Sequence, residues 1–264
     1  MAEFLAALTA FALLSASAAF GFLLRQKLAD RHLSERNLEA LRLVTGLLVT
    51  FAALVLSLLL ASVKASFDTS DRDRRLYAAE LTQLHQCMRN YGPELDASRL
   101  RLHAYVAAVI ASTWPDEPKP AGVNYPDPAE MPRTGEVGAL AALMRDIGLD
   151  LARLEPADSF HQVLAARCRA NFDHVQERRW AVIEDAQGSV SGPFAVVLMG
   201  WLMLVFVSFG LQAQRNAFTV VAIAMGALSV ATVIFVIADL DTPYTGLFGI
   251  PSTAMRHALS DMIR

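Results

Sequence analysis

The sequence lacks the patterns by which several classes of protein are recognised. It has no phosphate-binding glycine loop, no GxSxG turn and no HExxH helix, so it indicates no enzyme class and no cofactor. With 23 basic and 26 acidic residues it has a net charge of -3, and no dense basic patch could neutralise the phosphates of a nucleic acid. Apolar and polar residues nowhere alternate for long enough to predict a strand.

What the sequence contains instead is long hydrophobic runs. Of its 264 residues 54% are hydrophobic and only 19% are charged, which is too apolar for an ordinary soluble domain of this size. Four windows are long enough to cross about 30 Å of hydrocarbon as helices, and they cover residues 4–24, 43–63, 193–211 and 217–238. The first window has Glu3 as its only early charge and stays apolar to Leu24, so we expect a retained span and not a cleaved signal peptide.

These windows predict an all-α, polytopic membrane protein with four transmembrane helices. Residues 1–64 form one predicted transmembrane hairpin with an amphipathic loop at 25–42, and residues 193–240 form a second. Between them, residues 65–192 have the helical spacing of an extramembrane bundle, and residues 241–264 form a C-terminal tail. Within the insert we expect one helix to end at Gly92-Pro93, a second to be capped by Asp96 or Ser98, and the last to be capped by Asp158.

One face of the second window differs from the rest of it. Small or hydroxyl-bearing residues recur there at helical spacings of three and four and the series ends on a lysine; its members are Gly46, Thr50, Ala53, Ser57, Ala61 and Lys64. Two interpretations fit this face. It packs closely against another helix, or it lines a wetted pore with Lys64 at the mouth.

Two aspartates, Asp239 and Asp241, mark the end of the fourth window. In one interpretation these carboxylates are simply solvated at the membrane surface. In the other, a ring of them from several subunits attracts cations at a pore mouth or binds a metal ion.

Cysteine is scarce, and both cysteines lie in the insert. If the first and last insert helices run straight from the membrane, Cys87 and Cys168 stand about 34 and about 37 Å from it and are level with each other. A disulfide is then feasible if these helices are neighbours, whereas two buried free thiols are the alternative. A metal site formed by Cys168 and His161 is a third possibility. No CxxC or HxxxH spacing supports it, so we expect no metal.

The charges of the short loops predict the orientation. Four spans place both termini and the insert on one side, while the two short loops carry a set of basic residues: Arg25, Lys27, Arg31, Arg36, Arg42 and Arg215. The positive-inside rule therefore predicts cytoplasmic short loops and a periplasmic insert, in the oxidising compartment where a disulfide would persist. A competing basic cluster follows the second window: Lys64, Arg72, Arg74 and Arg75.

Three stretches of the chain resemble the bacterial bestrophin-like domain-of-unknown-function family. They are YVAAVIASTWP in the insert, ERRWAVIEDAQGSVSGPF before the third window and ADLDTPYTGLFGIPSTAMRHAL after the fourth. The most specific piece is the acidic-Leu-Asp-x-Pro-aromatic-x-Gly run from Asp239 to Gly246. This chain has Asp239 where the family commonly has glutamate, and Thr242 where it commonly has a basic residue.

The resemblance implies a four-span, homo-oligomeric membrane protein distantly similar to bestrophin anion channels, whose pore the second span lines. It also implies a cytoplasmic insert, which conflicts with the charge rule. From residues and resemblance together we expect an oligomeric, channel-like protein of the bacterial inner membrane, with the lipid bilayer, further copies of itself and inorganic ions as partners and with no nucleic acid. The alternative is a non-conducting scaffold or sensor whose insert binds a partner or responds to redox state.

Overall fold

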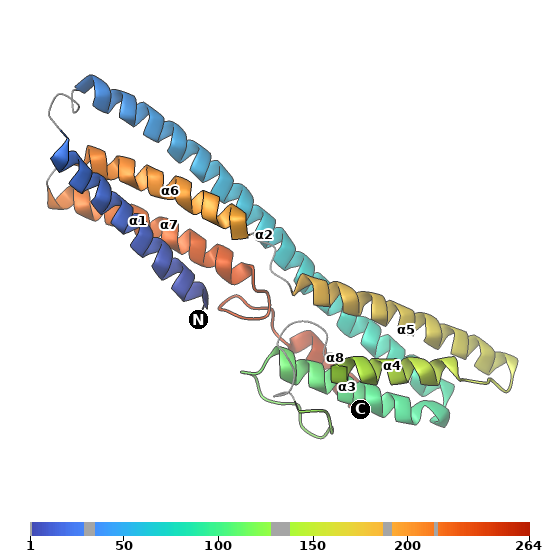
Figure 1. Ribbon diagram of the computed structural model, residues 1–264. Coiled ribbons are helices and arrows are strands. Elements are labelled where there is room, and N and C mark those ends of the chain that lie inside the picture. The colour runs from blue at the N-terminus through green and yellow to red at the C-terminus, as the bar shows by residue number, and fades with distance from the viewer. Residues whose placement is uncertain (1, 29–34, 128–137, 187–191, 214–215) are drawn as a thin grey trace. The chain divides into compact units, whose positions relative to one another are not determined.

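The computed structural model describes residues 2–28, 35–127, 138–186, 192–213 and 216–264. Within these ranges every regular element is helical, which confirms the all-α class (Figure 1). Arg31, Arg215 and the middle of the predicted amphipathic loop lie outside the described residues. The helices are α1 (Ala2–Lys27), α2 (Glu35–Tyr91), the short 3-10 helix η2 (Pro93–Leu95), α3 (Asp96–Thr113), α4 (Gly138–Ala152), α5 (Ser159–Asp185), α6 (Gly192–Gln212), α7 (Ala217–Leu240) and α8 (Thr253–Ile263).

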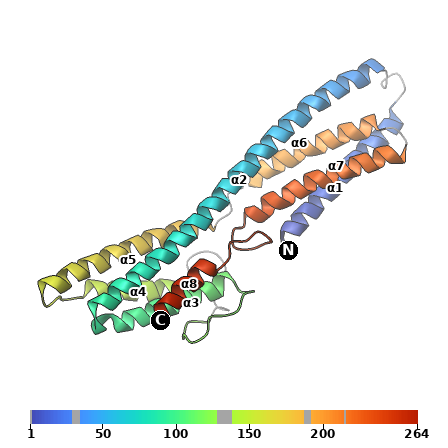
Figure 2. The ribbon, with the colours of Figure 1, turned by 180° about the vertical axis from the view of Figure 1, so that it is seen from behind.

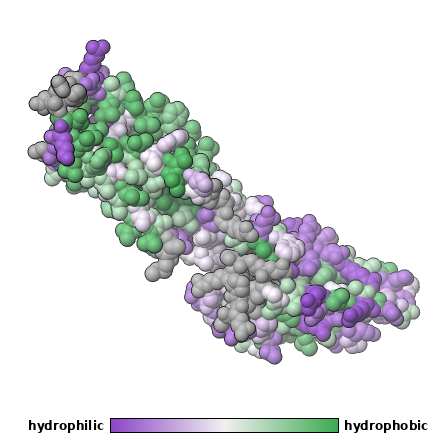
Figure 3. All heavy atoms as spheres, viewed as in Figure 1, coloured by the Kyte–Doolittle hydropathy of each residue, from purple (hydrophilic) through white to green (hydrophobic). Residues whose placement is uncertain are grey.

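The chain divides into two compact units. Unit 1 comprises Met1–Ser66 and Ser189–Asp241, and unit 2 comprises Phe67–Gly188 and Thr242–Arg264. The visible surface of unit 1 is mostly hydrophobic, whereas that of unit 2 is mostly hydrophilic (Figure 3). Helix α2 contributes to both units because it continues without a break from the apolar window into the polar sequence that follows.

Four helices are long and apolar enough to cross a membrane, as predicted: Glu3–Lys27, Glu35–Tyr91, Gly192–Gln212 and Ala217–Leu240. Unit 1 contains three of them and the first part of α2. Helix α1 packs against α6 and α7, and the three lie side by side in both views (Figures 1 and 2). Their small core also takes in one alanine of α2; its buried members are Leu14, Ala18, Ala52, Leu198, Leu202, Phe206 and Ala227. Most other side chains of these helices face outward, as expected where lipid or further protein covers them.

Two glycines allow α1 and α6 to approach closely. A Cβ atom at Gly210 of α6 would overlap the carbonyl oxygen of Ala18, and one at Gly21 of α1 would overlap that of Val207. The Arg25 guanidinium then donates to the carbonyl oxygen of Ala213 near one end of the pair. In a membrane such close backbone packing replaces the hydrophobic drive that holds helices together in water.

Gly210→Ala should therefore destabilise the fold by about 2 kcal/mol, because overlap with a backbone atom can be relieved only by moving a helix. Gly200→Ala is the matched control on the same helix, since a Cβ there meets nothing within 4 Å. Unfolding of both variants in detergent, followed by circular dichroism, measures the difference. Equal unfolding midpoints for the two variants would contradict the close crossing.

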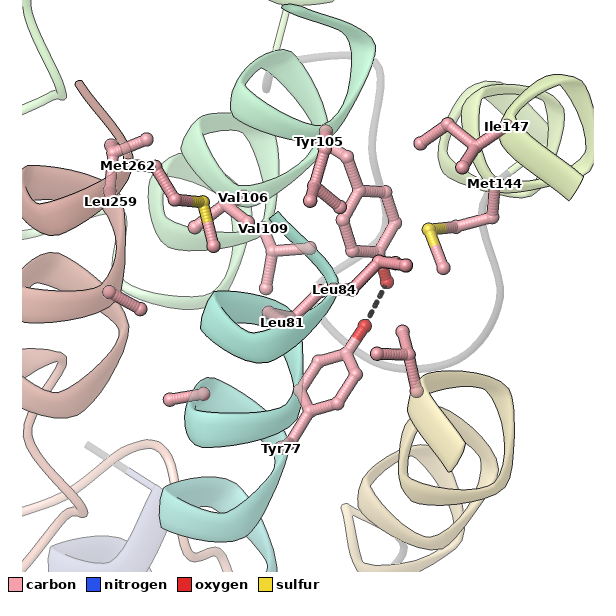
Figure 4. Packing of buried hydrophobic residues seen from close by; sticks show 14 of the residues in the cluster. Tyr77, Leu81, Leu84, Tyr105, Val106, Val109, Met144, Ile147, Leu259 and Met262 are labelled. Carbon is pink, nitrogen blue, oxygen red and sulfur yellow. Dashed lines mark hydrogen bonds between the residues drawn. The ribbon is translucent and has the colours of Figure 1, made fainter. Parts of the chain in front are cut away.

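Unit 2 is a helical bundle built on the second part of α2. Helix α3 packs on α4 and α8, and α4 packs on α5, so the tail helix is part of the bundle. Figure 4 shows its core, in which Met144 and Ile147 of α4 and Leu259 and Met262 of α8 surround side chains of α2 and α3. At its centre the hydroxyl groups of Tyr77 and Tyr105 are 2.6 Å apart, which gives each buried hydroxyl a hydrogen-bonding partner (Figure 4).

Two histidines whose rings are tilted against each other lie beside this core. The rings of His85 of α2 and His103 of α3 are 5.0 Å apart, and Arg99 donates to Nε2 of His85 at 3.4 Å. Burial, and then the charges of His103, Arg99 and Arg89, lower the pKa of His85 to about 4. His85 is only 2% exposed, so folding favours its neutral form.

The unfolded chain binds a proton at His85 more readily than the folded chain, so acid should destabilise unit 2. Between a pH of about 6.5 and about 4 the expected loss is up to about 3 kcal/mol. His85→Gln, which keeps an acceptor for Arg99, should lose less over the same interval, whereas His174→Gln, at an exposed position on α5, should behave like the wild type. Thermal unfolding at both pH values provides the test, and equal acid sensitivity of the wild type and His85→Gln would contradict it.

Candidate functional site

The predicted small-residue face of α2 is uncovered in the chain. All six of its members, from Gly46 to Lys64, are exposed, and a Cβ atom at Gly46 would meet nothing within 4 Å. A different side of the helix is the one that packs, because Thr45, Ala52 and Val63 are buried. The face is therefore not used for packing among the described residues of a single chain.

The hydroxyl groups on this face are bonded to their own helix. Thr50 donates to the carbonyl oxygen of Gly46 at 2.9 Å, and Ser57 donates to that of Ala53 at 2.8 Å. Each hydroxyl oxygen keeps lone pairs that can accept from water or a partner. Most other exposed side chains of α2 between residues 43 and 63 are large and apolar, such as Leu54 and Leu58, so the six residues form a distinct strip of small and polar side chains on this part of the helix.

The two aspartates after the fourth window occupy different environments. Asp239 is only 1% exposed, which differs from the solvated position considered from the sequence. Asp241 is half-buried at the C-terminus of α7, where its N–H donates to the carbonyl oxygen of Ile237 at 3.0 Å. It also lines a hollow of about 280 Å³ whose other walls include Ala6, Leu56 and Gly192.

A disulfide joins Cys87 of α2 to Cys168 of α5, with a Cα–Cα distance of 5.5 Å. Both residues are buried, and the bond closes a loop of 81 residues. His161 is engaged elsewhere, since its Nδ1 lies 2.7 Å from Asp158 Oδ2 and its ring meets Tyr91 edge-on. Among the described residues no group of three or more His, Cys, Asp or Glu residues could hold a metal ion.

A polar hollow of about 300 Å³ lies next to the disulfide. Carboxamides and one guanidinium make up most of its lining, which consists of Gln83, Gln86, Cys87, Asn90, Leu164, Arg167 and Asn171. These side chains come from α2 and α5, so the disulfide fixes the spacing of the walls of the hollow. Helical spacing of amides on the two helices was the only signal of it in the sequence.

The segment that follows α7 is docked by contacts that sequence reasoning missed. Glu117, just after α3, accepts from the Ser252 hydroxyl and from Arg256 Nε, the latter at 3.0 Å. Trp114 Nε1 donates to the carbonyl oxygen of Ile250 at 2.7 Å. The partners are more than 130 residues apart in sequence, so no local pattern could pair them.

Comparison with known proteins agrees with this architecture. A family model described as a bestrophin-like domain matches residues 12–255. A variant of a bacterial bestrophin homologue from Klebsiella pneumoniae has a TM-score of 0.63 and 14% identity, with 97% of each chain covered. A second crystal structure, described as a membrane protein, has a TM-score of 0.63 and 12% identity over 97% of each chain.

At these identities the solved structures show a shared fold and nothing more. No curated protein matches the sequence. The family match, however, covers nearly the whole chain and includes the Asp239–Gly246 run on which the resemblance was based. The chain therefore belongs to the bestrophin-like family.

Proposed function

We propose that the protein is an oligomeric, channel-like membrane protein in which the strip from Gly46 to Lys64 of α2 lines a path for inorganic ions. The observation that carries this proposal is the exposure of that strip on a helix that packs through a different side. Small residues and hydroxyl groups gain little from contact with lipid, but they leave room and hydrogen-bonding capacity for water and ions.

One chain supplies a single such strip, so a closed path requires several copies around an axis. Symmetric homo-oligomers are the usual way in which one surface is repeated around an axis. Lys64 would favour anions at one end of the strip, whereas Asp241 would favour cations wherever its carboxylate reaches the path. Family membership is compatible with this arrangement but does not identify the ion.

Ion flux into liposomes tests the proposal. The purified protein is reconstituted, and the uptake of chloride and of sodium is measured against protein-free liposomes. Flux of either ion above the protein-free level is the expected result. The ratio of the chloride flux to the sodium flux shows whether anions or cations pass more readily. No flux of either ion would contradict the proposal.

The alternative, a non-conducting scaffold or redox-responsive sensor, is favoured by a different observation: the disulfide beside the polar hollow of unit 2. In that case the strip of α2 would be packed against a neighbouring helix in the assembly. Ser57→Cys distinguishes the two, because a charged, water-soluble thiol reagent should modify it in a channel and not in a packed scaffold. Leu58→Cys is the control: it lies next to Ser57 on α2, at an exposed apolar position, and it reports how much labelling occurs from the lipid side.

We further propose that the protein lies in the bacterial inner membrane with residues 65–192 on the periplasmic side. The basic short loops and the disulfide support this orientation. Asn124→Cys places a thiol at an exposed position of the insert. An impermeant thiol reagent should label it in whole cells, and labelling only after lysis would reverse the orientation.

A further inference from the structure

A buried arginine holds the segment after α7 on unit 2. Arg74 of α2 is only 4% exposed, and its guanidinium carbon lies 4.4 Å from the centre of the Tyr244 ring and 5.2 Å from that of Trp114. The two rings meet edge-on with centres 6.0 Å apart. Because Trp114 also binds the backbone of Ile250, Arg74 and Trp114 together fasten the two ends of the 244–250 segment.

Two carboxyl groups lie beside this arginine. Asp73 of α2 is 3.4 Å from Arg178 Nη1 and is mostly buried. Burial, and then the carboxylates of Asp73 and Glu184, raise the pKa of Asp185 of α5, and a hydrogen bond with Asp73 adds to this effect. Arg74 opposes the rise without cancelling it.

Three polar atoms in this cluster are buried without a hydrogen-bonding partner: Arg74 Nε, Asp185 Oδ2 and Tyr244 Oη. Burying a polar atom without a partner is costly, so such atoms usually acquire one when a proton or a water molecule is added or when a group moves. A proton on Asp185 lowers the charge of the pair and supplies the donor that a hydrogen bond between two carboxyl groups needs. The single negative charge that remains on the pair draws Arg74 less strongly than two charges would, so its guanidinium remains over the two rings.

We propose that Asp73 and Asp185 form a proton-binding pair that controls, through Arg74, how tightly the 244–250 segment is held on unit 2. With the pair singly protonated, Arg74 stays on Tyr244 and Trp114 and the segment is docked. When Asp185 releases its proton to water, the second carboxylate draws the guanidinium away from Tyr244, and the segment loosens. Arg74 stays charged throughout, because an arginine does not deprotonate in this range.

The groups that face the pair come from every element around it. Helix α2 supplies Asp73 and Arg74, α5 supplies Arg178, Glu184 and Asp185, and the 244–250 segment supplies Tyr244. The sign follows from Asp185: the folded chain holds its proton more tightly than the unfolded chain, so docking is favoured at low pH and lost as the pH rises through the pKa of the folded state.

Infrared spectroscopy of the full chain in detergent tests the shared proton. The carbonyl stretch of a protonated carboxylic acid should persist in the wild type to a pH above the ordinary carboxyl range of about 4. Asp185→Asn should remove that band, whereas Asp71→Asn, which changes an aspartate of α2 paired with exposed Arg75, should leave it unchanged. Asp73→Asn removes the neighbouring charge and should shift the band's disappearance to lower pH. A band that titrates identically in all four proteins would overturn the proposal.

Hydrogen exchange tests the consequence for the segment. The Ile250 N–H donates to the carbonyl oxygen of Pro243 at 2.7 Å and reports whether the segment is closed. Protection at Ile250, corrected for the intrinsic pH dependence of exchange, should fall about tenfold or more in the wild type between a pH at which the carboxylic acid band of Asp185 is complete and a pH at which it has disappeared. In Asp185→Asn it should stay high at both values, and an equal fall in both proteins would overturn the proposal. Neither measurement requires ion flux, so this proposal and the proposed function can fail independently.

Discussion

Replacing Ser57 with leucine should reduce ion flux through reconstituted protein to less than about a tenth of the wild-type value. Ser57 lies in the middle of the exposed strip, between Ala53 and Ala61. Leucine removes the hydroxyl oxygen and places a large, branched apolar side chain among the small residues of the strip. In a ring of subunits the substitution is repeated by every copy, so a water-filled passage would become a hydrophobic constriction that dewets.

Ser208→Leu is the matched control for this substitution. Ser208 is also a membrane-span serine bonded to its own helix, since it donates to the carbonyl oxygen of Leu204 at 3.0 Å, but it belongs to α6 and not to the strip. Both variants should elute from gel filtration like the wild type, which separates loss of conduction from loss of assembly. Wild-type flux from Ser57→Leu would show that the ions do not pass along this face of α2.

The helical framework could be predicted because its signals are local. Four uncharged windows, each close to the thickness of a bilayer, leave few alternatives to four apolar helices. Helix α2 ends at Tyr91 because Gly92 takes a positive φ of 133° and Pro93 follows it, and both residues are visible in the sequence. Asp158 caps α5 as predicted, with its carboxylate accepting from the N–H of His161 at 2.8 Å.

Predictions failed where a distant partner decides what a side chain does. Neither Asp96 nor Ser98 caps α3, whose N-cap residue is Leu95. The hydroxyl of Ser98 instead donates to Asp150 of α4 at 2.6 Å, a partner 52 residues away. The sequence places Arg74 in a basic cluster near the membrane, but aromatic rings 40 and 170 positions further along cover it, and it is only 4% exposed.

The candidate site falls between these two cases. Its strip could be read from the spacing of small residues along one helix, and the structure leaves that strip exposed. Whether it meets water or another helix depends on neighbouring copies, which no pattern within one chain describes. For this reason Ser57 is compared with Leu58 of the same helix and with Ser208 of α6.

Removing the disulfide should destabilise unit 2 by about 4.5 kcal/mol, the chain-entropy value for a closed loop of this length. The Cys87→Ser, Cys168→Ser double variant keeps side chains of similar size, so most of the loss should come from the greater freedom of the unfolded chain. It should unfold at a lower denaturant concentration than the untreated wild type. A reducing agent should move the wild type to the midpoint of the variant and leave the variant unchanged.

The same cysteines also test the compartment of the insert. If free thiols are blocked with a first alkylating reagent as the cells are lysed, the denatured protein should react with a second alkylating reagent only after it has been reduced. That result requires an oxidising environment for residues 65–192 and therefore supports the periplasmic orientation. No reaction with the second reagent even after reduction would mean free thiols in the cell, and it would favour the cytoplasmic placement that the family resemblance implies.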